Sequence, residues 1–353
     1  MSSIPTRPLA MTTLYIDRRD AMLELRDGQL RLELPADEAQ PARSQRVPLA
    51  LLERIVAVSR TTVDTSTLAG LAEAGISLVA LGGRRGDRVA WLEGAFHNEA
   101  RIRIGQALAF ADPAHRLRLA QLIVAGKLRE QRRFLGHLLQ TRPDLRKPVF
   151  DALATLGQTR AGLRAADSLA AVRGLEGATA AAYFRACFAA FPPSLAPEGR
   201  RRRPPPDPVN AVLSLCYTLG TGHAVRAARV AGLDPAVGFL HAPAHARAAL
   251  ALDLLETERP AIDRFVWRLF AERTLEASHF GRDGSGACLL GKAGRGHLYG
   301  HWATTGAALE KRLTRRARRL ARHLVQFAPP PETEPIDEAD IDLSAEQPTG
   351  DPA

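Results

Sequence analysis

The chain has 353 residues and a formal charge of +10, with 48 Lys and Arg against 38 Asp and Glu. This length permits two domains, because a domain commonly takes about 100–200 residues. No run approaches about 18 consecutive apolar residues, and the N-terminus has no signal-peptide pattern, which excludes these two membrane signals. We therefore expect a soluble, cytoplasmic protein with no membrane contact.

The positive charge lies outside the C-terminal segment. Residues 329–353 contain eight acidic residues and no Lys or Arg, so the rest of the chain carries +18. A body this basic favours a polyanionic partner such as DNA, because binding releases counterions. The alternative is that an Arg- and Ala-rich composition reflects codon bias alone. The three cysteines are widely spaced and form no CxxC pair, which predicts reduced, buried thiols.

Residues 1–96 are expected to form a small β-rich domain. Asp27-Gly28 separates two alternating stretches within residues 22–34, which is a strong hairpin signal. Thr65 resembles the N-cap of a short helix that ends near Gly75. A glycine-rich turn follows at 82–86. Further strands are expected at residues 12–17, 55–58, 77–81 and 88–92.

From about Asn98 the apolar period changes from two to 3.6. The second domain, residues 97–327, is therefore expected to be all-helical, and the fold class to be α+β. A loop at 199–208 is too rich in Arg and Pro for a helix interior, and Pro208 suits the first turn of the next helix. Helices are expected at residues 116–139, 165–190, 208–232, 247–257, 260–276 and 305–326.

The last predicted helix is strongly basic. Its cationic side chains occupy more than one face, which suggests DNA contact, with Arg315 and Arg319 as candidates. An exposed Arg-rich helix without a partner is the alternative. The acidic tail, residues 328–353, is expected to be disordered and could screen this helix.

Acidic residues and one histidine in apolar surroundings are candidates for chemistry. Glu176 lies in an Ala-rich helix between two glycines and shares a helical face with Tyr183. Asp253 and Glu256 stand three apart in the apolar run ALALDLLE, where they need a cation or an Arg such as Arg259. The alternative reading of Glu176 is an ordinary acid near a helix start.

His241 lies in GFLHAPAH, in a turn before a helix expected from about Ala244. A lone histidine is more often a satisfied polar residue than a ligand. His245 stands four residues later, but Pro243 argues against a regular helical zinc pair and HExxH is absent. With Glu176 and Glu256, His241 makes a set of two carboxylates and an imidazole. Such a set suits Mg²⁺ or Mn²⁺ with positions left for phosphate and water, and hence phosphodiester chemistry.

One other motif is excluded. Residues 286–292 fit the first seven positions of a phosphate-binding P-loop, but Ala293 follows where a Ser or Thr must hold Mg²⁺. Nucleotide hydrolysis is therefore not expected.

In order along the chain, several segments resemble the CRISPR-associated integrase of spacer acquisition, the Cas-one family. They are Glu176-Gly177 with Tyr183-Phe184, then RRPPPDPVNAVLSLCYTLG at 202–220, then GFLH, LALDLLE and Arg259-Pro260. The resemblance runs from Thr12 to about Phe327. Two features depart from the family pattern: the GRG-type turn reads GGRRGD, and the acidic tail is outside it.

The resemblance implies an N-terminal β domain, a helical domain, and a homodimer built through the β domains. It implies that Glu176, His241 and Glu256 bind the metal and that Asp253 supports them. A DNA 3′-hydroxyl would attack a phosphodiester of the CRISPR repeat, and water in its place would give nuclease activity. Asn210, Tyr183 and Tyr217 are candidates for DNA contact, with core packing as the alternative. A small partner, Cas-two, is expected to bridge two dimers.

Two other functions remain open. A repair or transposon-type nuclease outside CRISPR would keep the same site, whereas a basic DNA-binding scaffold would use the acids only for structure.

Overall fold

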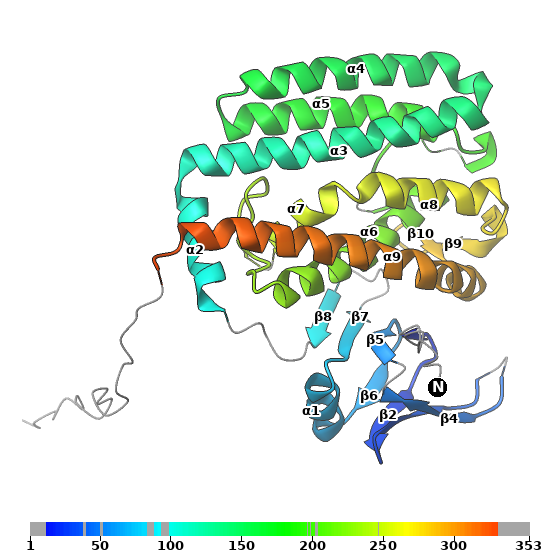
Figure 1. The fold of residues 1–353 in the computed structure, drawn as a ribbon. Coiled ribbons are helices and arrows are strands. Elements are labelled where there is room, and N and C mark those ends of the chain that lie inside the picture. The colour runs from blue at the N-terminus through cyan, green and yellow to red at the C-terminus, as the bar shows by residue number, and fades with distance from the viewer. Residues whose placement is uncertain are drawn as a thin grey trace, which may run out of the picture.

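The computed structural model describes residues 12–37, 40–49, 52–82, 88–92, 99–195, 197, 199–201, 204–245 and 247–330. It is an α+β fold in which a β-rich region precedes a largely helical one (Figure 1). Most of the predicted glycine-rich turn and of the acidic tail lies outside these residues. Among the described residues, no helix is both long and apolar enough to cross a membrane.

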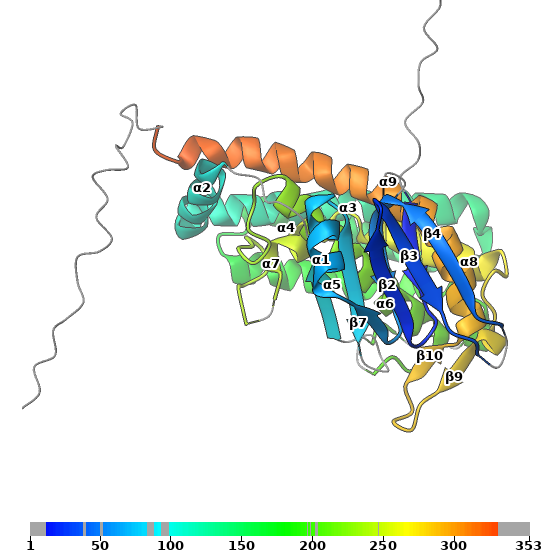
Figure 2. The ribbon, with the colours of Figure 1, turned by 90° about the horizontal axis from the view of Figure 1, so that it is seen from below.

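Two four-stranded sheets and one helix make up the N-terminal region (Figure 2). One sheet has the order β1-β5-β7-β8, with parallel pairs β1–β5 and β5–β7 and an antiparallel β7–β8 pair. The other has the order β4-β3-β2-β6. The bounds are β1 Thr12–Ile16, β2 Ala21–Arg26, β3 Gln29–Leu34, β4 Arg43–Pro48, β5 Leu52–Ala57, β6 Thr61–Val63, α1 Thr65–Glu73, β7 Ser77–Gly82 and β8 Arg88–Leu92.

The predicted hairpin is confirmed. Strands β2 and β3 pair antiparallel, and the two residues between them, Asp27 and Gly28, have φ of 50° and 69°. Positive φ at both central positions is what a type I′ turn requires, and this turn matches the twist of the strands it joins. The cap of α1 was misplaced by one residue, because Asp64, not Thr65, accepts the backbone N–H of Thr67.

The sequence prediction missed two strands of this region, β4 and β6. Strand β4 is an edge strand made mostly of polar, exposed residues, so it lacks the apolar alternation that marks a half-buried strand. Strand β6 has only three residues.

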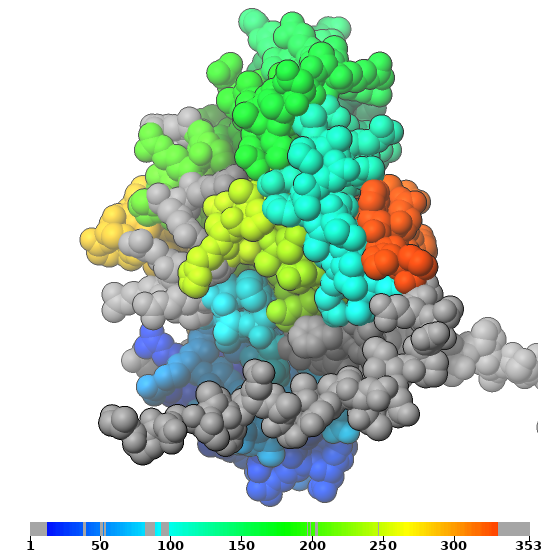
Figure 3. All heavy atoms as spheres, turned by 90° about the vertical axis from the view of Figure 1, so that its left-hand side faces the viewer, coloured from blue at the N-terminus to red at the C-terminus, as the bar shows by residue number. Residues whose placement is uncertain are grey.

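Eight helices follow in the described part of the second region. Helices α3, α4 and α5 each pack against the other two, and α9 crosses in front of α6 (Figure 1). The end of α9 lies against α2, at the right of Figure 3. The bounds are α2 Ala100–Ala111, α3 Pro113–Thr141, α4 Arg146–Ala165, α5 Leu169–Phe188, α6 Pro208–Val230, α7 Ala249–Glu256, α8 Arg259–Ala271 and α9 Lys292–Leu324.

The expected "all-helical" region also contains a short antiparallel pair, β9 (Phe280–Arg282) and β10 (Cys288–Leu290). Two helices, α2 and α4, were missed. Helix α9 begins thirteen residues before the predicted start at 305, because its first half is rich in glycine and histidine. All three cysteines lie in the described part, buried and free, as predicted.

One sheet faces two cores. Val79 and Leu81 of β7 pack into the helical core, whereas Leu78 packs into the core of the β-rich region and Ala80 packs against that core. Successive side chains of a strand point to opposite faces, so one strand serves both cores. The N-terminal sheet is therefore a wall of the helical region, and the division at residues 96 and 97 stays a prediction.

Candidate metal centre

Helix α5 supplies the first predicted ligand. Its N-cap Ser168 accepts the N–H of Ala171, and Gly174 and Gly177 leave the helix surface open on both sides of Glu176. The Glu176 carboxylate forms an ion pair with the ammonium of Lys127 on the neighbouring helix α3. Its side chain stays 27% exposed, so an approaching ligand can reach it.

The segment before α7 supplies His241, which was predicted correctly to lie in a turn. The helix starts at Ala249, later than the expected Ala244. The Nδ1 atom of His241 lies 2.6 Å from Asp253 Oδ1. Because a carboxylate only accepts, Nδ1 carries a proton, and Nε2 is the ring nitrogen that could bind a metal. Nε2 lies 3.9 Å from Glu256 Oε1.

Asp253 holds the whole turn as well as the imidazole ring. It is 1% exposed and accepts the backbone N–H groups of Phe239, Leu240 and His241 at 2.6, 3.0 and 2.9 Å. A Cβ on Gly238 would come within 2.6 Å of the Ala249 backbone, so only glycine lets the turn pack this closely on α7. Asp253 therefore fixes the position of His241, and its role in supporting a metal ligand stays a prediction.

Glu256, the last residue of α7, is 4% exposed. Its Oε1 lies 2.8 Å from Arg259 Nε, and its Oε2 lies 2.5 Å from Lys127 Nζ. Burial alone would raise the pKa of Glu256, but Arg259 and Lys127 outweigh burial and hold this pKa at about 2. The side chain is therefore a buried anion over the whole physiological pH range.

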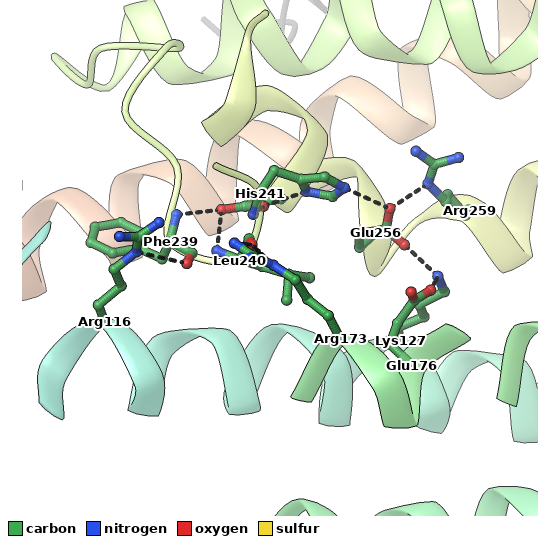
Figure 4. Close-up of polar contacts among 10 residues, drawn as sticks. Arg116, Lys127, Arg173, Glu176, Phe239, Leu240, His241, Glu256 and Arg259 are labelled. Carbon is green, nitrogen blue, oxygen red and sulfur yellow. Dashed lines mark hydrogen bonds and ion pairs between the residues drawn. The ribbon is translucent and has the colours of Figure 1, made fainter. Parts of the chain in front are cut away.

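Lys127 is the centre of this arrangement (Figure 4). Its ammonium contacts both carboxylates, Glu176 from α5 and Glu256 from α7. Burial lowers the pKa of Lys127, yet the carboxylates of Glu256 and Glu176 reverse this effect and raise the pKa overall. The position of the Lys127 ammonium, which both carboxylates contact, therefore favours a positive charge.

The residues present fit a divalent cation. Glu256 Oε2 is a buried oxygen that receives no hydrogen bond of acceptable geometry from any described residue, although Lys127 Nζ is near it. Hard carboxylate oxygens beside a neutral imidazole nitrogen are the donors that Mg²⁺ and Mn²⁺ accept. Among the described residues, no three acidic, His or Cys side chains are close enough to hold an ion without rearrangement, because Lys127 lies between the two acids.

The structure places three other predicted residues in the interior. Tyr183 and Tyr217 are 1% and 8% exposed, and both hydroxyls donate to the buried carboxylate of Asp263. Asn210 is fully buried, where its amide bonds Asp207 and Gly199. This is the alternative that the sequence left open, a satisfied core residue, and DNA contact by these three stays a prediction.

The basic face of α9 is partly used inside the protein. Arg312 and Arg316 both pair with Glu258, at 2.7 and 3.1 Å. Arg315 and Arg319, the two named candidates for DNA contact, are exposed. Their contact with DNA stays a prediction.

Sequence reasoning missed Lys127 and gave Arg259 only as a possible partner of the acids. A signal for Lys127 was present, because it is one of four lysines in the chain and falls between Val124 and Leu128 on the apolar face of the predicted helix. Its partners could not be read from the sequence, since α3, α5 and α7 meet only through tertiary packing. His245 is exposed, with no role in the site.

Comparison with known proteins identifies the family. Residues 14–304 match the family described as CRISPR associated protein Cas1. The CRISPR-associated endonuclease Cas1 1 of Thermodesulfovibrio yellowstonii is 33% identical over 291 residues, covering 82% of this chain and 89% of that protein. The CRISPR-associated endonuclease Cas1 2 of Rhodospirillum rubrum is 34% identical over 308 residues, covering 83% and 85%.

Two solved structures share the fold. A casposase bound to integration product superimposes with a TM-score of 0.80 at 21% identity, covering 94% of this chain and 97% of that chain. A Cas6-RT-Cas1–Cas2 complex gives 0.75 at 21% identity, covering 93% of this chain and 36% of that one. The matched residues span the β-rich region, Glu176, His241 and Glu256, and the chain belongs to the Cas1 family of CRISPR associated proteins.

Proposed function

We propose that this chain is a divalent-metal-dependent DNA endonuclease and strand-transfer enzyme of CRISPR adaptation. The observation that carries the proposal is that Lys127 joins the carboxylates of Glu176 and Glu256, while His241 Nε2 lies 3.9 Å from Glu256, in a Cas1 family member. Curated relatives are named endonucleases, and one structure of the same fold holds an integration product. Both names agree with phosphodiester chemistry at this position.

Glu176, His241 and Glu256 would hold the metal, Mg²⁺ or Mn²⁺. When bound, it would polarise a scissile phosphate and stabilise the charge that develops on it. Asp253 keeps the proton on His241 Nδ1, so Nε2 remains available as a donor to the metal. Arg259 keeps Glu256 ionised although the side chain is buried.

The attacking group would be a DNA 3′-hydroxyl for strand transfer or water for hydrolysis. Neither reaction needs a nucleophile from the protein. The three cysteines of the chain are buried, and burial raises the pKa of the Cys187 thiol well above its usual range. The protein's role is to position the phosphate and to stabilise charge.

The partners follow from the same family. We propose DNA as substrate, a second copy of this chain as a homodimer partner, and the small protein Cas2 as the bridge between dimers. The Cas6-RT-Cas1–Cas2 complex, whose Cas1 part shares this fold, supports the Cas2 proposal. The charge of +18 outside the acidic segment supports the choice of DNA.

A branched duplex that mimics an integration intermediate tests the reaction. We expect strand cleavage and rejoining with Mn²⁺ or Mg²⁺ and none with a chelator. Glu176→Gln and His241→Ala should lower the rate by more than a hundredfold while DNA binding stays near the wild-type level. The matched control is Asp151→Asn, which removes an exposed acid of α4 whose ion-pair partner among the described residues is Lys147, at 2.9 Å.

Two results would contradict the proposal in different ways. Wild-type rates in the Glu176 and His241 variants would remove these residues from the site. No metal-dependent DNA breakage by the wild-type protein would favour a DNA-binding scaffold. A repair or transposon-type nuclease would keep the activity, and the absence of a repeat array near the gene would favour it.

A further inference from the structure

Charged groups hold the turn that carries His241 from both of its edges (Figure 4). On the amide edge, the carboxylate of Asp253 accepts three backbone N–H groups. On the carbonyl edge, two arginines donate to the oxygens of Phe239 and Leu240. Backbone groups of an irregular segment need partners, and for residues 239–241 the partners found among the described residues are charged side chains.

The contact from Arg173 is the stronger of the two on the carbonyl edge. Its Nε and Nη2 both donate to the carbonyl oxygen of Leu240, at 2.9 and 2.7 Å. Arg116 donates from Nε to the Phe239 oxygen at 3.3 Å, and its guanidinium lies 4.2 Å from the centre of the Phe110 ring. Two N–H groups on one oxygen fix the direction of the Arg173 side chain as well as its distance.

Arg173 stands three residues before Glu176 on α5, so the two side chains are neighbours on one helix surface. Asp253 likewise stands three residues before Glu256 on α7. The His241 turn is therefore tied to Glu256 through Asp253, and to Glu176 through Arg173. Arg173 and Leu240 are 67 positions apart in the chain, so no local backbone geometry sets this second spacing.

Resting on the metal site of the proposed function, we propose that Arg173 is a positioning residue that sets the spacing between the Glu176 carboxylate and the His241 imidazole. Arg116 assists from α3. The two guanidiniums lie close enough to repel: burial and then the charge of Arg173 lower the pKa of Arg116. The carbonyls of the turn and the Asp253 carboxylate offset this repulsion and keep both arginines in place.

Mn²⁺ binding to the DNA-free protein tests this role, because it requires no catalysis. In isothermal titration calorimetry, Arg173→Gln should weaken Mn²⁺ binding about tenfold, the lower end of the loss seen when groups that orient metal ligands are removed. Removing a positive charge beside a cation site removes electrostatic repulsion, and this effect alone would tighten Mn²⁺ binding. Weaker binding is therefore the sign of lost positioning.

The matched control is Arg185→Gln, which removes the same charge from an exposed position on the same helix and should leave Mn²⁺ affinity unchanged. Arg173→Lys keeps the charge but lacks the planar guanidinium that directs two N–H groups at the Leu240 oxygen, so it should lose Mn²⁺ affinity to an intermediate degree. If Arg173→Gln does not fold, Arg173→Lys decides: wild-type affinity there overturns the proposal.

Two further results would test the positioning role of Arg173 and the metal site on which it rests. Wild-type Mn²⁺ affinity in folded Arg173→Gln, with weaker DNA binding, would make Arg173 a phosphate contact and overturn the positioning role. Glu176→Gln, titrated in parallel, separates the two proposals. If Glu176→Gln binds Mn²⁺ like the wild type while Arg173→Gln binds weakly, the assignment of Glu176 as a ligand fails, and with it the metal site on which this inference rests.

Discussion

At the residue scale, the ammonium of Lys127 lies where the proposed divalent cation would contact the carboxylate oxygens of Glu176 and Glu256. Metal binding would therefore require Lys127 to move aside. We expect Lys127→Met to bind Mn²⁺ several-fold more tightly than the wild type at pH 8, measured by calorimetry without DNA. The control is Lys147→Met, on an exposed lysine of α4, which should leave the affinity unchanged. Weaker binding in Lys127→Met would show that Lys127 holds the acids in position instead.

Asp253, in contrast to Lys127, is expected to stabilise the fold, because it accepts four hydrogen bonds while nearly fully buried. In Asp253→Asn the charge is lost and an N–H₂ group must face a backbone N–H. We expect the free energy of unfolding to fall by about 3 kcal/mol in urea denaturation. Asp151→Asn, on an exposed helix surface, should change it by no more than about 0.5 kcal/mol. Equal effects in the two variants would contradict the supporting role of Asp253.

At the element scale, glycine decides how closely α2 and α9 pack. A Cβ on Gly105 of α2 would lie 2.0 Å from the carbonyl oxygen of Leu324 at the end of α9, and a backbone atom cannot easily move away. A Cβ on Gly136 of α3 would meet no atom within 4 Å. We expect Gly105→Ala to lower the melting temperature clearly, whereas Gly136→Ala should raise stability by about 0.5–1 kcal/mol through helix propensity.

Thermal denaturation followed by circular dichroism checks this pair of variants. Both make the same chemical change inside a helix, so intrinsic helix preference alone predicts that both stabilise the protein. An unchanged or higher melting temperature in Gly105→Ala would mean that α2 is not packed against the end of α9 as the structure shows.

The elements that the sequence predicted well are those whose periodicity is local. The β2–β3 hairpin follows from Asp27-Gly28 between alternating stretches, and α6 begins at Pro208 as expected. Helix α4 was predictable but overlooked: its buried residues, Val149, Ala152, Leu156, Thr159 and Leu163, recur at helical spacing. Strand β4 was not predictable, because a polar edge strand owes its conformation to its neighbour β3.

In the candidate site, too, local sequence patterns indicated some residues, whereas others depend on tertiary contacts. Glu176, His241 and Glu256 were proposed as ligands from the order of motifs along the chain, and Asp253 as their support from its spacing from Glu256; these roles stay predictions. The partners of these residues were not found. Lys127 and Arg173 act across helices that meet only after folding, so nothing in local spacing reveals the atoms they contact.

At the scale of the whole molecule, a buried polar cluster joins the β-rich region to the helices. Arg54 of β5 donates to Glu310 of α9 at 2.8 Å, and His223 of α6 contacts both residues. Arg226 also donates to Glu310, at 2.7 Å. Removing one member of such a cluster leaves buried charge without compensation. The orientation of the two regions therefore depends on these ionic contacts as well as on apolar packing.

His223 of this cluster and the Asp263 carboxylate change the free energy of unfolding with pH in opposite directions. Burial, aided by Arg54, lowers the pKa of His223 to about 4, so its contribution to stability is complete above pH 6.5 and declines as the pH falls towards 4. Burial raises the pKa of Asp263 to about 6 against the hydroxyls of Tyr217 and Tyr183, so its contribution is complete below pH 3.8 and is lost as the pH rises through 6.

Each shift of about two pKa units corresponds to a free energy on the order of 2–3 kcal/mol at 1.36 kcal/mol per unit, and the two nearly cancel. We therefore expect the unfolding free energy of the wild type to change little between pH 7 and pH 5. In His223→Gln, stability should rise as the pH falls across this range, because of these two groups Asp263 alone still titrates. In Asp263→Asn it should fall, because of the two His223 alone remains.

Urea denaturation at pH 5, 6 and 7 measures both slopes, and slopes are informative even where a substitution lowers stability at every pH. Glu256 and Glu310, whose pKa values are held below the usual range, lose their contributions only below about pH 4.5 and stay constant in this window. Slopes of the same sign in the two variants would mean that His223 or Asp263 is not the buried group that sets the pH dependence. Opposite slopes would show that the contributions of His223 in the buried polar cluster and of Asp263 to the unfolding free energy offset each other in this pH range.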